Sequence, residues 1–284
     1  MKRPEQLPGN LLLITLLATA LSACGGGSSS SDSATAVTPA NPVNPVAPVT
    51  PVAPVSGDTG SVSAPFAGNA SARYLLLAVA SQSTGALTSV SQGANGALSE
   101  IAGAAFTGTP AITREISGDA SFAQGRWFTG TITRSTGATV MSGNNASAHY
   151  NVYKTLASLP ASGSLACDAG TFTAPSYTGG GVIGQDAYFG AASGSATLSF
   201  GATGASLAMT VNASAGGQQA SISGAGLLAA PASTAIGGGF LGGSSGTLLA
   251  LGDAGAGRYL VIGGYKVVLA NGASYQGVAT FRCS

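Results

Sequence analysis

The sequence predicts an all-β, antiparallel domain that follows an export signal and a proline-rich linker. From Ser61 onward, short apolar or alternating runs are broken by Gly, Asn and Ser, and no stretch carries a helical apolar stripe with caps. Charged residues make up only 7% of the chain, whereas glycine accounts for 44 residues. We therefore expect short strands joined by tight turns, with a neutral and hydroxyl-rich surface.

The first element, residues 1–23, has the organisation of an export signal. Lys2 and Arg3 precede an apolar stretch over residues 11–20, which is too short to span a bilayer. The following run, Leu21-Ser22-Ala23-Cys24, resembles the lipobox of bacterial lipoproteins. The resemblance implies that Cys24 receives the lipid and becomes the first mature residue, and Gly25 suggests delivery to the outer membrane. The alternative is an ordinary cleaved signal with a chance cysteine at its end.

The second element, residues 24–58, is expected to be a disordered linker. A Gly/Ser segment over residues 25–33 is followed by prolines at every third position, namely Pro39, Pro42, Pro45, Pro48, Pro51 and Pro54. Because a polyproline II helix has three residues per turn and rises about 3.1 Å per residue, these prolines share one edge of a rod roughly 50 Å long. We interpret the rod as a spacer, with a docking ligand for aromatic grooves as the alternative.

The third element, residues 59–284, contains a clear strand pattern near its centre. Thr197 and Ser199 alternate with apolar residues and should face water. The apolar positions with this period of two are Ala196, Leu198 and Phe200, then Leu207, Met209 and Val211 after a turn. Ala220 and Ile222 indicate the next strand.

A C-terminal hairpin is predicted around Asn271-Gly272. A two-residue turn would place Val267 opposite Gln276 and split the apolar residues between two faces. A three-residue loop over residues 270–272 places Val267 opposite Tyr275 and puts the apolar residues on one face. We therefore predict the three-residue loop, with Gly272 in a left-handed conformation.

Cysteine and histidine are scarce after the signal. Beyond Cys24 only Cys167 and Cys283 remain, and because an exported chain folds where disulfides persist, we expect them to pair, with two separate thiols as the alternative. His149 is the only histidine, so we expect it to be structural, and we predict no metal site and no cofactor. Ser244 fits a Gly-x-Ser-x-Gly pattern, but no helix is expected after it and His149 precedes it. We assign no catalytic residue.

The charge balance bears on possible partners. Removing Lys2, Arg3 and Glu5 with the signal leaves the mature chain without net charge. Nothing in this balance attracts nucleic acid, so we predict no nucleic-acid partner.

A series of short motifs carries a family resemblance. They are Gly125-Arg126-Trp127, His149-Tyr150, Leu159-Pro160-Ala161-Ser162-Gly163, the strand over residues 194–200, and Gly277-Val278-Ala279-Thr280-Phe281. Their order resembles a β-rich region of proteobacterial surface and FecR-associated proteins. More loosely, residues 74–284 are similar to the small β-barrel of transferrin-binding-protein-B-like lipoproteins. This resemblance implies a closed or nearly closed antiparallel barrel of about eight strands.

These observations support a lipid-anchored outer-membrane protein whose β-barrel binds a host protein, a nutrient carrier or an envelope partner. Its membrane contact is the lipid on Cys24, and the leaflet that it faces is left open. Arg126, Trp127, His149 and Tyr150 form the candidate binding surface, because Arg and aromatic residues dominate binding hot spots. The alternative for Trp127 and Tyr150 is a place in the core. Two other functions stay open, a structural envelope component and an exported hydrolase.

Overall fold

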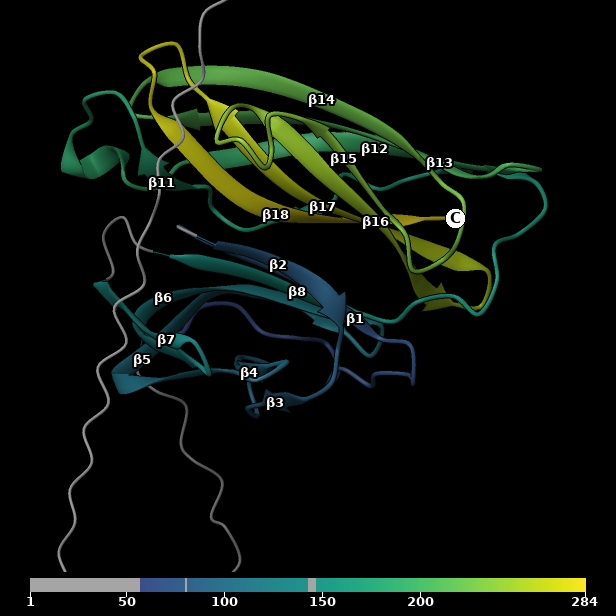
Figure 1. Cartoon of the computed structure of the whole chain (residues 1–284), viewed down its shortest axis with the longest axis horizontal. Coiled ribbons are helices and arrows are strands. Elements are labelled where there is room, and N and C mark those ends of the chain that lie inside the picture. The colour runs from purple at the N-terminus through teal and green to yellow at the C-terminus, as the bar shows by residue number, and fades with distance from the viewer. Residues whose placement is uncertain (1–56, 80, 143–146) are drawn as a thin grey trace, which may run out of the picture. The chain divides into compact units, whose positions relative to one another are not determined.

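The computed structural model describes residues 57–79, 81–142 and 147–284, which form three antiparallel β-sheets (Figure 1). The all-β, antiparallel fold class is thereby confirmed. The predicted signal, Cys24 and almost all of the predicted linker lie outside the described residues. Within the described residues, no helix has the length and apolar character needed to cross a membrane.

The first sheet, called here the N-terminal sheet, has eight strands. It runs in the order β2-β1-β8-β6-β5-β4-β3, and β7 pairs with β6. Its strands are β1 (Arg73–Ala78), β2 (Ser81–Ala86), β3 (Val90–Gln92), β4 (Leu98–Ile101), β5 (Ala104–Asp119), β6 (Phe122–Arg134), β7 (Gly137–Ser142) and β8 (Ala148–Tyr153).

The rest of the chain forms two further sheets. The four-stranded sheet has the order β14-β13-β12-β9, with strands β9 (Gly163–Ala166), β12 (Ala191–Gly201), β13 (Gly204–Ala215) and β14 (Gln218–Leu228). The six-stranded sheet has the order β10-β18-β17-β16-β15, and β11 also pairs with β18. Its strands are β10 (Thr171–Phe172), β11 (Ser176–Gly179), β15 (Thr234–Gly238), β16 (Gly246–Gly255), β17 (Arg258–Val268) and β18 (Ser274–Cys283). A short 3₁₀ helix, Gln185–Ala187, precedes β12.

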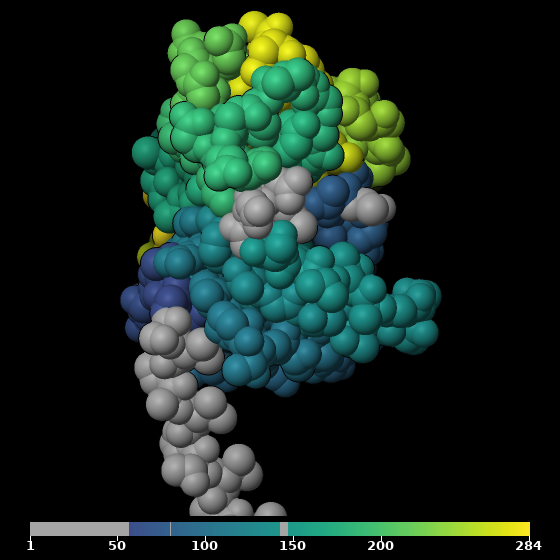
Figure 2. All heavy atoms as spheres, turned by 90° about the vertical axis from the view of Figure 1, so that its left-hand side faces the viewer, coloured from purple at the N-terminus to yellow at the C-terminus, as the bar shows by residue number. Residues whose placement is uncertain are grey.

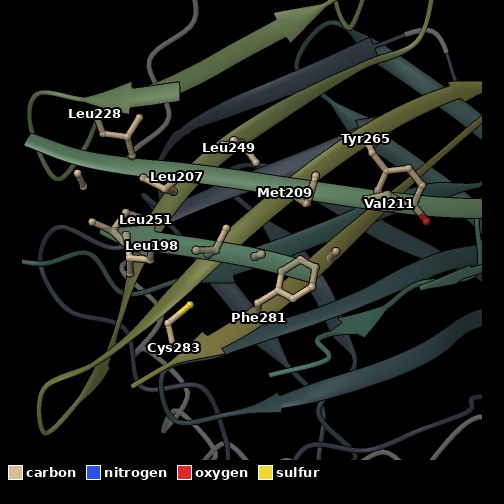
Figure 3. Close-up of a cluster of buried hydrophobic side chains, with 14 of the residues drawn as sticks. Leu198, Leu207, Met209, Val211, Leu228, Leu249, Leu251, Tyr265, Phe281 and Cys283 are labelled. Atoms are coloured by element: carbon tan, nitrogen blue, oxygen red, sulfur yellow. The ribbon is translucent and has the colours of Figure 1, made fainter. Parts of the chain in front are cut away.

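The four- and six-stranded sheets pack face to face into a barrel-like unit. Figure 3 shows its core, in which Leu198 and Met209 lie among Leu249 and Phe281 of the facing sheet. The predicted alternation is confirmed, because the apolar positions of β12 and β13 are buried while Thr197 is exposed. Strand β14 extends over the predicted positions Ala220 and Ile222.

Small residues allow β14 to lie close to the six-stranded sheet. A Cβ atom at Gly224 would overlap the side chain of Thr247, and one at Gly226 would overlap that of Ala235. Strands β14 and β15 nevertheless belong to different sheets, so hydrogen bonding does not run continuously around the unit.

The C-terminal hairpin has the predicted register. Val267 lies opposite Tyr275 and Tyr265 opposite Gly277. The loop contains residues 270–272, and Gly272 has φ = 81°. Both expectations are confirmed, and this loop length puts Tyr265, Val267 and Tyr275 on the same face of the hairpin.

The predicted disulfide between Cys167 and Cys283 is also confirmed. Cys167 follows β9 directly, and Cys283 ends β18. Backbone hydrogen bonds flank the bridge, from Asp168 N to Arg282 O at 2.8 Å and from Ser284 N to Ala166 O at 3.0 Å. The bridge therefore fastens one end of the four-stranded sheet to the last strand of the six-stranded sheet.

Strands β16, β17 and β18 of the six-stranded sheet are buried on both faces. Leu251 and Val261 face the four-stranded sheet, while Leu248 and Val278 pack against Leu75 and neighbouring residues of the N-terminal sheet. Figure 2 shows the blue and teal surface of the N-terminal sheet adjoining the green and yellow surface of the later strands. Near-continuous apolar runs in β16 and β17 are typical of strands covered on both sides.

The barrel-like unit is smaller than the expected span of residues 59–284. About eight strands were expected, whereas the two sheets of the unit hold ten, β9–β18, from Gly163 onward. Residues 73–153 form a sheet of their own, which the resemblance did not imply. Apolar and polar residues alternate only weakly along its strands, because β6 and β8 are buried on both faces.

Candidate functional site

The four residues predicted as a binding surface lie on two neighbouring strands. Strands β6 and β8 pair so that Arg126 lies opposite His149 and Gly125 opposite Tyr150. Because side chains alternate along a strand, Trp127 and Tyr150 point to one face of the N-terminal sheet, and Arg126 and His149 point to the other. The structure thus brings the four together in two pairs on opposite faces.

Trp127 and Tyr150 belong to the core of the N-terminal sheet. The indole nitrogen of Trp127 donates a hydrogen bond to Leu98 O at 2.7 Å, and Leu98 N donates to the Tyr150 hydroxyl at 3.3 Å. The Trp127 ring stacks on Phe106 with centroids 5.1 Å apart. Both side chains are fully buried, so the core alternative holds for them. Burial raises the pKa of the Tyr150 phenol, which therefore stays protonated.

Arg126 forms a partly buried ion pair on the opposite face. Its Nη2 and Nε donate to the two carboxylate oxygens of Glu115 at 2.6 and 2.7 Å, and its Nη1 donates to Ser147 Oγ at 3.2 Å. The side chains of Arg126 and Glu115 are 4% and 28% exposed. The guanidinium also lies over the rings of Phe128 and Phe189, 5.2 and 4.3 Å from their centroids. Because Phe189 comes from the segment before β12, this contact joins the N-terminal sheet to the later chain.

His149 is structural, as predicted. Its Nδ1 lies 2.7 Å from Thr173 Oγ1 and its Nε2 lies 2.7 Å from Ser176 Oγ, so both ring nitrogens are engaged. Burial holds the pKa of the imidazole well below its usual value, and the positive charge of Arg126 lowers it further. The neutral ring therefore connects β8 to the segment that holds β10 and β11.

The prediction that these four residues form a recognition surface is wrong. All four are buried, with Trp127, His149 and Tyr150 fully enclosed and Arg126 almost so. Their aromatic and cationic character serves packing within the N-terminal sheet and its contact with the later strands. A sequence pattern cannot distinguish these roles, because hot-spot residues and buried anchors are the same residue types.

A cluster of buried polar side chains lies between the N-terminal and six-stranded sheets. It contains Gln124, Asn151, Gln276 and Thr280, and we call it the polar seam. No sequence pattern indicates it. The Thr280 hydroxyl donates to Gln124 Oε1 at 2.6 Å and accepts from Asn151 Nδ2 at 2.7 Å. Gln276 Nε2 donates to Leu77 O at 3.2 Å. Among the described residues, three of its buried side-chain atoms have no hydrogen-bond partner: Gln124 Nε2, Asn151 Oδ1 and Gln276 Oε1.

The grooves on the surface of the described residues include the three that follow. A groove of about 580 Å³ on the four-stranded sheet is lined only by uncharged residues, among them Asn212 and Gln219. A second groove, of about 460 Å³, is lined by Ser81 and Gln82 of β2, by Val79, by the turn at residues 241–243 and by Lys266. A third, of about 260 Å³, shares Val79 and Ser81 with the second and is mostly apolar.

The chemistry that the described residues offer is limited. They contain no cluster of three or more His, Cys, Asp or Glu side chains with the geometry to hold a metal ion. Ser244 is exposed in a turn that leads into strand β16, whereas a nucleophile elbow leads into a helix. Both nitrogens of His149 are engaged elsewhere, as described above.

Comparisons with known proteins found no match. No family model, curated protein or solved structure is similar to this chain. The resemblance to transferrin-binding-protein-B-like lipoproteins therefore stays a proposal. Functional inference rests on the residues and contacts described above.

Proposed function

We propose that the chain is a lipid-anchored outer-membrane lipoprotein whose β-sheets form a non-enzymatic binding module. Cys24 carries the lipid, the Pro-rich linker holds the module away from the membrane, and the partner is a host protein, a nutrient carrier or an envelope component. The resemblance to transferrin-binding-protein-B-like lipoproteins is part of this proposal.

The observation that carries this proposal is the disulfide between Cys167 and Cys283. Disulfides persist in exported proteins and are rare in the cytosol, so the bridge agrees with the export signal in front of it. Cys24 is then the one cysteine outside the pair, and it stands where the lipobox requires it.

The distribution of polar chemistry favours binding over catalysis. His149 is enclosed and neutral, Arg126 is paired with Glu115, and the grooves of about 580 and 260 Å³ are lined by hydroxyl, amide and apolar groups. A general acid or base must reach its substrate, which an enclosed imidazole does not do.

Lipid attachment can be tested by labelling with radioactive palmitate in the native host. We expect label on the chain and its loss in a Cys24→Ser variant, while the matched Cys167→Ser variant keeps its label. Label that persists in Cys24→Ser, or its absence from the unaltered chain, would refute the anchor.

The alternative function, a structural envelope component, is distinguished from a binding role by cross-linking the module to whatever associates with it and by deleting the chain. If the chain cross-links only to other envelope components and its deletion weakens the envelope, a structural role replaces the binding module. For the hydrolase alternative, activity that survives both Ser244→Ala and His149→Ala would exclude a serine nucleophile.

A further inference from the structure

The groove beside β2, called here the β2 groove, brings together an open strand edge, polar groups without partners and exposed apolar side chains. It has a volume of about 460 Å³. Its walls include Val79, Ser81 and Gln82 from the β1–β2 region, Leu241 from the turn before β16, and Lys266 of β17. Two sheets therefore contribute to one concave surface.

The first feature is a free strand edge. Strand β2 ends the N-terminal sheet and, among the residues that the structure describes, pairs only with β1. Its sequence, Ser-Gln-Ser-Thr-Gly-Ala, has neither a charge nor a proline, the two devices that usually prevent pairing at an edge. Ser81, Thr84 and Ala86 are exposed. Such an edge can accept a further strand through main-chain hydrogen bonds.

The second feature is a set of side-chain groups without partners. Lys266 Nζ lies 5.7 Å from the centre of the Phe240 ring, and it forms neither of the two ion pairs found among the described residues. Gln82 Nε2 donates to Phe240 O at 3.2 Å, but Gln82 Oε1 is buried and accepts no hydrogen bond within the described part of the chain. The groove thus contains a cation without an anion and an acceptor without a donor.

The third feature is exposed apolar surface. Val79 is 43% exposed and Leu241 is 69% exposed, and both line the β2 groove. The mostly apolar groove of about 260 Å³ continues from Val79 and Ser81 toward Ile132 and Met141. These aliphatic side chains beside an open strand edge offer apolar surface on which a partner can pack.

We propose that the β2 groove binds an extended peptide strand that carries a carboxylate. The peptide main chain pairs with the edge of β2, one of its N–H groups donates to Gln82 Oε1, and its carboxylate approaches Lys266. Its apolar side chains pack on Val79 and Leu241. A neutral glycan would leave Lys266 unpaired, whereas a peptide satisfies all three features. This inference rests on the binding role proposed above and names the class of partner.

The test uses the full chain, purified from membranes in detergent, and a fluorescein-labelled peptide of sequence Thr-Val-Thr-Glu-Thr-Val-Thr. Binding is followed by fluorescence anisotropy. We expect saturable binding, and we expect a peptide with Gln in place of Glu to bind about fivefold more weakly, as for a partly exposed ion pair. In Lys266→Gln the two peptides should bind equally, whereas the matched variant Lys154→Gln should keep the difference.

Strand pairing is tested on the peptide and not on the protein, which avoids variants that fail to fold. Two peptides are made, one methylated at the backbone nitrogens of its odd-numbered residues and the other at those of its even-numbered residues. Each peptide lacks one of the two sets of N–H donors that could join the edge of β2. We expect one of the two methylated peptides to lose binding.

Three results would overturn the inference. They are no binding at about 1 mM peptide, equal affinity of the Glu and Gln peptides for the unaltered chain, and full binding by both methylated peptides. None of these depends on palmitate labelling, so the β2 groove can fail while the lipid anchor stands.

Discussion

At the scale of single residues, two tyrosine–glycine pairs occupy equivalent positions in different sheets. Tyr150 lies over Gly125 across β8 and β6, and Tyr265 lies over Gly277 across β17 and β18. A Cβ atom at either glycine would overlap the phenol ring of the opposite tyrosine. Both rings are fully buried and each hydroxyl is hydrogen-bonded, so a shift of either ring would disturb its packing and its hydrogen bond.

Gly277→Ala is therefore expected to lower the free energy of unfolding by about 1–3 kcal/mol, the usual cost of overpacking a core. Urea denaturation of the purified chain measures this loss. Gly201→Ala is the matched control, since nothing lies within 4 Å of a Cβ atom at the end of β12. Equal stability of the two variants would show that Tyr265 can move aside.

His149 makes stability depend on pH. Its pKa in the folded protein is lowered by burial and then by Arg126, whereas in the unfolded chain it returns to its ordinary value near 6.5. Below that ordinary value the unfolded state binds the proton and the folded state does not, so stability falls as the pH decreases.

Between about pH 6.5 and 5 we expect the free energy of unfolding to fall by up to about 1.4 kcal/mol per pH unit. Asp119 and Glu100, whose pKa values are lowered, contribute only at lower pH. Urea denaturation of the unaltered chain and of His149→Gln across this range isolates the histidine. The slope should be absent in the variant, and an unchanged slope would mean that another group titrates.

At the scale of elements, the link between β9 and β18 combines one covalent bond with two flanking backbone hydrogen bonds. Cys167 and Cys283 are 116 positions apart, and the bridge fastens two strands that belong to different sheets. A bridge across so long a loop restricts the unfolded chain strongly.

Replacing both cysteines, as in Cys167→Ser with Cys283→Ser, should cost about 4–5 kcal/mol of stability on the chain-entropy model. Denaturation of the double variant, compared with the unaltered chain before and after reduction, measures this cost. The reduced chain should match the variant. If reduction leaves the unaltered chain as stable as before, the bridge constrains little.

An element could be predicted from the sequence where residues close together in the chain determine it. The register of the β17–β18 hairpin follows from Asn271-Gly272 and from the need to bury Val267 and Tyr275 on one face. The polar seam could not be found in this way. Gln124 and Thr280 are 156 positions apart, and only the packing of two sheets brings them together.

At the scale of the whole described region, the six-stranded sheet is the centre of the arrangement. It shares an apolar core with the four-stranded sheet on one face, and it meets the N-terminal sheet through apolar clusters and the polar seam on the other. Short alternating runs without a helical stripe predicted the all-β class, because a period of two is the pattern of a strand with one buried face. They could not predict how many sheets form, since that depends on which faces become buried.

Burial also explains why the predicted binding surface is wrong. Arg126, Trp127, His149 and Tyr150 were predicted as a surface from their residue types, and the pairing of β6 with β8 places all four inside. The β2 groove had no signal in the sequence, because Gln82, Leu241 and Lys266 meet only in the folded chain.

The central proposal, a binding module displayed from the outer membrane on a lipid anchor, is tested most directly on intact cells. External protease is added, and the module beyond Gly57 is followed in the medium, with a periplasmic protein as the control for membrane integrity. We expect cleavage in the predicted linker to release the module while the control stays intact. A module that stays protected until the outer membrane is broken would contradict display at the cell surface.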